Sequence, residues 1–180
     1  MPMARRRTLL IGSAALLGGA GAAGMWWQAG GRQFRSLADL RRTLDALVIG
    51  QGPAWQAQGA WGVSKVLLHL AQSVDYSLDG YPQMESERFR STVGQAAWGV
   101  FVRRGAMNHG LHQPIPGATA LPAAEPVQSA AAVLITALER FERSTGPLQP
   151  HFAYGALSKP EYTLAHLMHA SDHWTEFRPT

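Results

Sequence analysis

The chain has 180 residues, 46% of them hydrophobic and none of them cysteine, which is enough for one domain with its own core but excludes disulfides and thiolate metal ligands. Lys and Arg (16) outnumber Asp and Glu (12), yet Arg5, Arg6 and Arg7 stand together near the N-terminus, so the rest of the chain carries 13 against 12. That nearly neutral remainder argues against a nucleic-acid partner.

Residues 1–25 have the pattern of an export signal. The arginine run is followed by Thr8-Leu9-Leu10 and a stretch of Gly, Ala and Leu, which resembles a twin-arginine signal, and residues 20–22 offer a small-residue cleavage site. The alternative is an uncleaved N-terminal membrane anchor, although this apolar run is barely long enough to span and contains several glycines. We therefore expect an exported, periplasmic protein, or one that this segment anchors to the inner membrane.

The rest of the chain divides into a linker, residues 26–36, and a helical domain, residues 37–180. Apolar residues recur at helical spacing in five stretches: 36–49, 61–78, 86–103, 127–144 and from Ser158 onward. The last of these opens as a capping box does, with a Glu three residues after the Ser and a Pro in the first turn. A long loop punctuated by Gly and Pro, Gly105–Pro126, separates the third stretch from the fourth. Since no stretch alternates as a strand would, the sequence predicts an all-α fold, an antiparallel helical bundle around one core.

The last helix carries three histidines, His166, His169 and His173. At 100° per residue their side chains fall within about 60° of one another on the helix surface. His166 and His173 stand roughly 10 Å apart along the axis, which is too far for one ion. His169 and His173, at positions i and i+4, can converge on one metal as the histidines of H-E-x-x-H do. We predict that this pair ligates a metal and that His166 lines the adjoining pocket or supports a ligand.

His69 is the third candidate ligand, because it lies in the middle of a different helix at the edge of its apolar stripe. Helical bundles build metal sites from side chains on facing helices. Three neutral imidazoles with an open fourth position suit Zn²⁺, Ni²⁺ or Fe²⁺. Asp172 and Gln72, each close in helical space to a proposed ligand, are candidates to orient the imidazole rings. The alternative for His69 alone is a packed, hydrogen-bonded histidine.

Three further histidines lie in loops. His109 and His112, among the glycines of the long loop, are expected to be exposed to solvent, and the alternative is a contribution to a lid. His151 either caps and packs its own loop or faces a substrate, and the sequence does not separate these two roles. No Asp or Glu near the proposed ligands is a convincing general base.

Several sequence blocks together resemble the domain-of-unknown-function 1569 family, from about Leu37 to Phe177. The blocks are Leu68-His69-Leu70-Ala71-Gln72-Ser73, Pro114-Ile115-Pro116-Gly117, Pro150-His151-Phe152-Ala153-Tyr154-Gly155 and Ala165-His166-Leu167-Met168-His169. That family is placed in the DinB-like superfamily. The resemblance implies a four-helix bundle core and a divalent metal held by one His of the second helix and an H-x-x-x-H pair of the last, here His69, His169 and His173. It also implies homodimers, which are common among DinB-like bundles.

These observations lead to two hypotheses about function. The first is a metalloenzyme acting on a small molecule, either a hydrolase or, as the resemblance to DinB-like relatives that use low-molecular-weight thiols implies, a thiol transferase. The second is a non-catalytic exported bundle that holds a structural metal or none and binds a partner. A general acid or base near the metal separates the two, and Asp75 and Asp172 are the carboxylates nearest in sequence to the proposed ligands.

Overall fold

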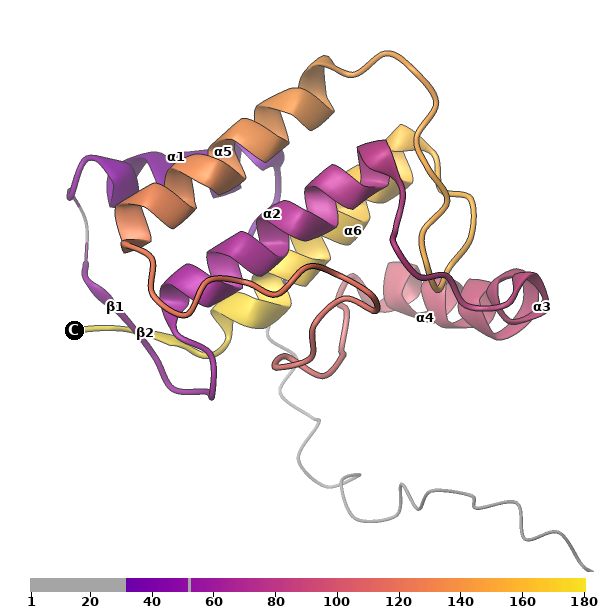
Figure 1. The fold of residues 1–180 in the computed structure, drawn as a ribbon, viewed down its shortest axis with the longest axis horizontal. Helices are drawn as coiled ribbons and strands as arrows, with labels where there is room; N and C mark the ends of the chain where they lie inside the picture. Colours follow the sequence, from indigo (N-terminus) through magenta and orange to yellow (C-terminus); the bar gives the residue numbers. More distant parts are fainter. Residues whose placement is uncertain (1–31, 52) are drawn as a thin grey trace, which may run out of the picture. The chain divides into compact units, whose positions relative to one another are not determined.

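The computed structural model describes residues 32–51 and 53–180, and these are mostly α-helical (Figure 1). The predicted export signal or anchor, residues 1–25, lies outside the described residues, as does most of the predicted linker. Within the described part of the chain, no helix combines the length and the apolar character needed to cross a membrane.

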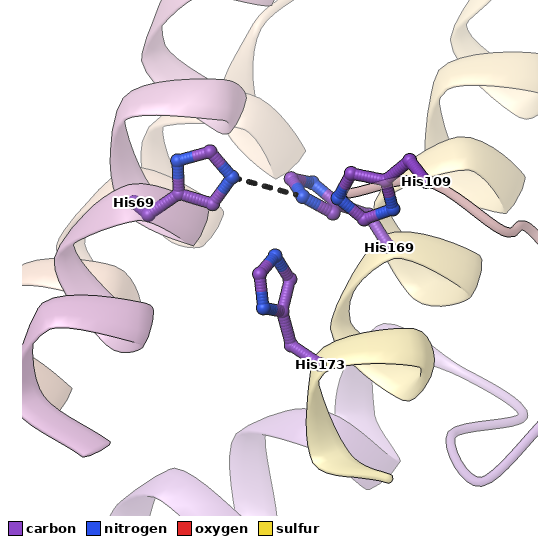
Figure 2. Close-up of side chains that lie close together, drawn as sticks. All are labelled: His69, His109, His169 and His173. Carbon is purple, nitrogen blue, oxygen red and sulfur yellow. Dashed lines mark hydrogen bonds between the residues drawn. The ribbon is translucent and has the colours of Figure 1, made fainter. Parts of the chain in front are cut away.

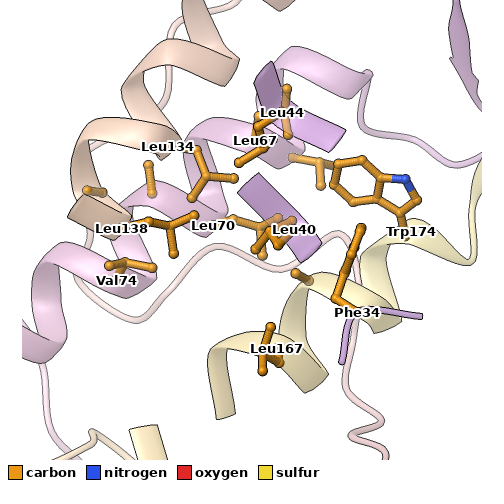
Figure 3. Packing of buried hydrophobic residues seen from close by; sticks show 14 of the residues in the cluster. Phe34, Leu40, Leu44, Leu67, Leu70, Val74, Leu134, Leu138, Leu167 and Trp174 are labelled. Carbon is orange, nitrogen blue, oxygen red and sulfur yellow. The ribbon is translucent and has the colours of Figure 1, made fainter. Parts of the chain in front are cut away.

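Four helices form the core: α1 (Leu37–Val48), α2 (Val63–Asp79), α5 (Val127–Arg143) and α6 (Lys159–Trp174). Helix α5 packs against α1 and α2, and α2 packs against α6, as Figure 1 shows. The apolar stripe of each helix faces the others, and burial of these side chains supplies the main stabilisation. Figure 3 shows the resulting cluster, which includes Leu40, Leu44, Leu67, Leu70, Leu134, Leu138, Leu167 and Trp174.

Capping residues in the sequence mark the starts of α1 and α6. Ser36 caps α1 by accepting a hydrogen bond from the backbone N–H of Asp39. The predicted capping box of α6 is confirmed: the Ser158 side chain accepts from the Glu161 N–H, and the Glu161 carboxylate accepts from the Ser158 N–H. The start of α6 is therefore fixed, and with it the position of every later side chain on this helix.

The third predicted helix contributes little to the core. It comprises α3 (Glu87–Phe89), a π-helical segment η1 (Arg90–Gly94) and α4 (Gln95–Arg104). In this stretch only Gly94 and Trp98 are buried, whereas Val93 and Val100 are exposed. Its apolar spacing therefore predicts a helix correctly, but this helix does not join α1, α2, α5 and α6 in enclosing the core. The long loop runs from this outlying helix to α5.

Two short strands correct the expectation of a purely helical fold. Strand β1 (Trp55–Ala57) pairs with β2 (Phe177–Pro179) in an antiparallel sheet, in which Trp55 lies opposite Pro179. Each strand has three residues, which is too short for an alternating pattern to stand out in the sequence.

The packed part of the chain also begins earlier than Leu37. Phe34, which the sequence analysis places in the linker, is 2% exposed and packs edge-on against Trp174 with ring centroids 4.9 Å apart. Its backbone N–H donates to the Ser171 hydroxyl of α6 at 3.1 Å. This aromatic contact ties the start of the domain to its last helix.

Candidate metal centre

Helices α2 and α6 bring the three predicted ligands together. His69 projects from α2, and His169 and His173 project from α6 toward it, as Figure 2 shows. The Nε2 atoms of His69 and His169 are 3.2 Å apart. The ring centroid of His69 lies 5.0 Å from that of His169 and 5.1 Å from that of His173. The i, i+4 spacing on α6 and the packing of α2 against it therefore place these three imidazoles around one point.

A fourth histidine, His109, reaches the same point from the long loop between α4 and α5 (Figure 2). One ring nitrogen of each of the four residues lies within 4.8 Å of the others. The centroid of the His109 ring is 4.8 Å from that of His169 and 5.2 Å from that of His173. The expectation that His109 is solvent-exposed is therefore wrong, because the loop folds back over the C-terminal half of α6.

Two histidine–carboxylate pairs hold this loop on α6. Nδ1 of His109 lies 2.9 Å from Oδ2 of Asp172, and Nε2 of His112 lies 2.8 Å from Oε2 of Glu176. Asp172 thus orients an imidazole of the cluster, as expected of it, but the ring belongs to the loop rather than to a neighbour on its own helix. His112, expected to be exposed, is partly buried and lies beside the cluster rather than in it.

Gln72 does not orient a ligand. Its Nε2 donates to the backbone carbonyl of Thr119 at 2.9 Å, so it fastens the long loop to α2. The sequence predicts that Gln72 supports His69, because it lies about one helical turn away on the same helix. Its side-chain amide instead donates to a loop carbonyl that lies within reach. This hydrogen bond still serves the site, because the loop that Gln72 holds is the one that carries His109.

Burial keeps the imidazoles of the helices neutral. Together with neighbouring histidines such as His109, it lowers the pKa of His69 to about 4 and that of His173 to about 2. Burial likewise lowers the pKa of His169 well below its ordinary value. At neutral pH these rings therefore have free lone pairs, which is the form that binds a metal ion.

Unpartnered nitrogen atoms show that the cluster fits a metal ion. Among the described residues, Nδ1 of His69, Nε2 of His109 and both ring nitrogens of His173 are buried without a hydrogen-bond partner. Leaving buried polar atoms unpaired costs about 1–3 kcal/mol each. Two nitrogens bound to one tetrahedral zinc ion lie about 3.3 Å apart, close to the 3.2 Å between His69 and His169. A cation at the centre would satisfy Nε2 of His109 and one nitrogen of His173, since each imidazole offers one ligand atom to an ion.

A pocket of about 190 Å³ adjoins the cluster. His69, His109 and His169 line it, and so do His166 and His151, as the sequence analysis allowed for both. Its remaining walls include Ser73, Tyr81, Met107, Ile115, Phe152, Tyr154 and Tyr162. A molecule in this pocket would lie directly against the imidazole cluster.

Comparison with known proteins places the chain in one family. A model of the family described as "Protein of unknown function (DUF1569)" matches residues 30–180. The chain belongs to the DUF1569 family. No curated protein and no solved structure matches it. The family assignment confirms the resemblance seen in the sequence blocks, and its description does not state an activity.

Sequence reasoning found three of the four clustered histidines of this DUF1569 domain. It missed His109 because an irregular loop has no periodicity from which the direction of a side chain can be read. The available signal was the loop itself, since a loop of this length in a compact domain is usually functional. Its two histidines match two carboxylates at the end of α6, a pairing that the sequence alone does not indicate.

Proposed function

We propose that this DUF1569 domain is a DinB-like four-helix bundle, formed by α1, α2, α5 and α6, that binds one divalent metal ion. The ligands are His69, His169 and His173 from the helices and His109 from the loop. The observation that carries the proposal is the convergence of four imidazole nitrogens within 4.8 Å, several of them buried and unpartnered. An all-nitrogen site of neutral imidazoles suits Zn²⁺, Ni²⁺ or Fe²⁺.

The proposed activity is that of a metal-dependent hydrolase or thiol transferase acting on a small molecule. A divalent ion held by these histidines would supply a Lewis acid, and catalysis would need one coordination position beyond the protein ligands for a water or thiol whose pKa the ion lowers. The chain's own residues have three tasks: the four histidines hold the ion, Asp172 orients the His109 ring, and the pocket positions the substrate beside them.

A specific observation favours a second candidate, a structural metal site in a binding module. The cluster offers four protein ligands, which is the number that closes a structural tetrahedral site, and it contains no carboxylate. A screen of thiol and ester substrates with the metal-loaded chain separates the two candidates. Turnover that depends on the metal supports the enzyme, and its absence across both substrate classes supports the binding module.

For the N-terminal segment we propose export, with the periplasm as the destination and the inner membrane as the alternative if the segment stays attached. The support is the arginine run and the weakly apolar stretch that follows it. Export by a twin-arginine route would carry a folded, metal-loaded domain. Fractionation of cells that express the full chain tests this, with Arg6→Lys/Arg7→Lys as the variant expected to remain in the cytoplasm.

Metal analysis tests the proposed centre. Untagged protein, analysed by mass spectrometry of its elements, should contain about one divalent ion per chain. His69→Ala and His173→Ala should each lose it, because each leaves an incomplete ligand set. His151→Asn is the matched control, since this histidine lines the pocket but does not belong to the cluster, and it should keep the ion. Circular dichroism checks that all three variants remain helical. A full complement of metal in His173→Ala would overturn the ligand assignment.

A further inference from the structure

His151, which stands in the loop between α5 and α6, is a further polar residue that lines the pocket. The backbone of this loop closes on itself: the His151 N–H donates to the Gly155 carbonyl at 2.8 Å, and the Gly155 N–H donates back at 3.1 Å. The turn needs a glycine, because Gly155 has a φ of 76°. These main-chain hydrogen bonds fix the backbone of His151, and with it the position from which the side chain projects.

The hydrogen bonds of the His151 ring determine which nitrogen carries the proton. Nδ1 accepts from the backbone N–H groups of Ala153 and Tyr154, each at 3.2 Å. An accepting Nδ1 has no proton, so in the neutral ring the proton is on Nε2. Burial and the neighbouring His166 lower the pKa of His151 to about 3, so the ring is neutral at physiological pH. Nε2 is thus a hydrogen-bond donor, and no other described residue accepts from it.

Aromatic neighbours hold this ring in place. It stacks on Tyr154 with centroids 4.2 Å apart and an interplanar angle of 3°. The rings of Phe152 and Tyr81 lie at 4.7 Å and 5.0 Å. Because stacking on one face and the two N–H donors at Nδ1 oppose rotation, the Nε2–H donor is oriented before any ligand arrives. Preorganised donors bind at a lower entropic cost.

The chemistry of the pocket walls limits what it accepts. No Lys, Arg, Asp or Glu is among its lining residues, so the walls offer no countercharge to a cationic ligand. His166 also lines the pocket, is 4% exposed, and leaves its Nε2 buried with no partner among the described residues. An apolar cavity of about 150 Å³ binds benzene. The volume here, about 190 Å³, therefore suits a ring of that size with one small substituent.

We propose that this pocket binds a small uncharged molecule of about benzene size whose carbonyl or hydroxyl oxygen accepts a hydrogen bond from Nε2 of His151. The inference rests on the proposed function in so far as this pocket is the substrate site of the proposed metalloprotein. The ligand lies in the pocket that both the imidazole cluster and the His151 donor line. His151 acts here as a specificity residue, distinct from the four histidines that hold the metal.

Calorimetric titration of the purified full chain with benzamide tests the proposal. Benzamide is neutral, carries a carbonyl oxygen and has the required size. Benzamidinium is the matched control, since it has nearly the same shape but is positively charged and has no acceptor. Benzamide should bind at one site, and benzamidinium should bind at least about 10-fold more weakly, because an ion pays a desolvation penalty in uncharged walls. No heat of binding with millimolar benzamide, or equal affinity for the two probes, would overturn the proposal.

Two variants separate a ligand-binding role of His151 from a role in its own loop. The amide of Asn can reach the place of Nδ1 and keep the backbone hydrogen bonds, whereas that of Gln reaches the place of Nε2. His151→Asn should weaken benzamide binding about 3- to 10-fold, and His151→Gln should retain most of the affinity. Unchanged binding in the Asn variant, or an equal loss in both, would show that His151 serves only its loop.

The metal content of the same samples keeps the two proposals apart. Both His151 variants should contain as much metal as the parent chain, since His151 does not belong to the cluster. A chain without metal that still shows the benzamide pattern would refute the proposed metal function alone. A metal-loaded chain that does not bind benzamide would refute this inference alone.

Discussion

Asp172 precedes His173 on α6, yet its carboxylate is bonded to the imidazole of His109. A neutral His109 ring donates from Nδ1 to this carboxylate, which leaves the lone pair of Nε2 for the cluster. The carboxylate therefore fixes both the tautomer and the direction of a ring that stands on a loop. Without it, nothing else among the described residues would hold the His109 side chain toward His169 and His173.

Replacement of this carboxylate should weaken metal binding without abolishing it. In Asp172→Asn we expect the affinity for Zn²⁺ to fall about 10- to 100-fold, as is typical when the partner of a ligating histidine is lost. Competition with a chromophoric chelator measures the change in affinity. His109→Ala removes the ring that Asp172 orients, so it gives the largest loss of affinity that Asp172→Asn can cause through His109. Asp75→Asn is the control, because Asp75 pairs with Arg140 on the surface. An affinity in Asp172→Asn equal to that of the control would contradict the role of Asp172.

At the scale of elements, the π-helical segment η1 supports the His151 loop. Gly94, the last residue of η1, is buried, and a Cβ atom there would overlap the carbonyl oxygen of Ala153 and lie 3.0 Å from its carbonyl carbon. Gln95 donates to the carbonyl of Tyr154 from the adjoining first residue of α4. The outlying helix therefore contributes to the pocket indirectly, by positioning the loop on which His151 stands.

A pair of glycine substitutions tests this contact. Gly94→Ala should lower the free energy of unfolding by about 1–3 kcal/mol, because the added methyl group displaces the backbone of the loop. Gly99→Ala, in the same helical stretch, should leave stability unchanged or raise it by up to about 1 kcal/mol, since nothing lies within 4 Å of its Cβ position. Urea denaturation compares the two. Equal effects would mean that η1 does not press on the loop.

The sequence predicts most helices because each has a strong local signal. Periodic apolar residues and the capping box locate α1, α2, α5 and α6 within a few residues, and the i, i+4 histidines of α6 follow from its register. The strands depend on a pairing between segments more than a hundred residues apart, which no local pattern encodes. The same limit hides His109, since its position depends on a hydrogen bond between a loop and a distant helix.

At the scale of the whole molecule, buried neutral histidines make stability depend on pH. Burial lowers the pKa of His166 to about 3, and together with His166 it lowers that of His151 to the same value. In the unfolded chain both have a pKa of about 6.5. Between these two values the unfolded state binds more protons than the folded state. The free energy of unfolding therefore falls as the pH is lowered from about 6.5 toward 3.

We expect this acid sensitivity to decrease when one such histidine is removed. Each buried neutral histidine contributes a slope of about 1.4 kcal/mol per pH unit in that range. His166→Leu, which keeps an apolar side chain of similar size between Phe141 and Tyr162, should reduce the slope by about that amount. Urea denaturation between pH 5 and 7, with a chelator present to remove metal effects, measures it. A slope identical to that of the parent chain would show that His166 is not buried neutral.

The separation of the clustered histidines along the chain also bears on when a metal ion is acquired in the cell. His169 follows His69 by 100 residues, and α5 together with the long loop is made in between. A nascent chain on the ribosome offers only His69 and His109 until α6 is synthesised. Because the loop is held by carboxylates at the far end of α6, even His109 has no fixed direction before that helix docks. The proposed ion would thus be taken up last, and metal loading would report that synthesis and folding are complete.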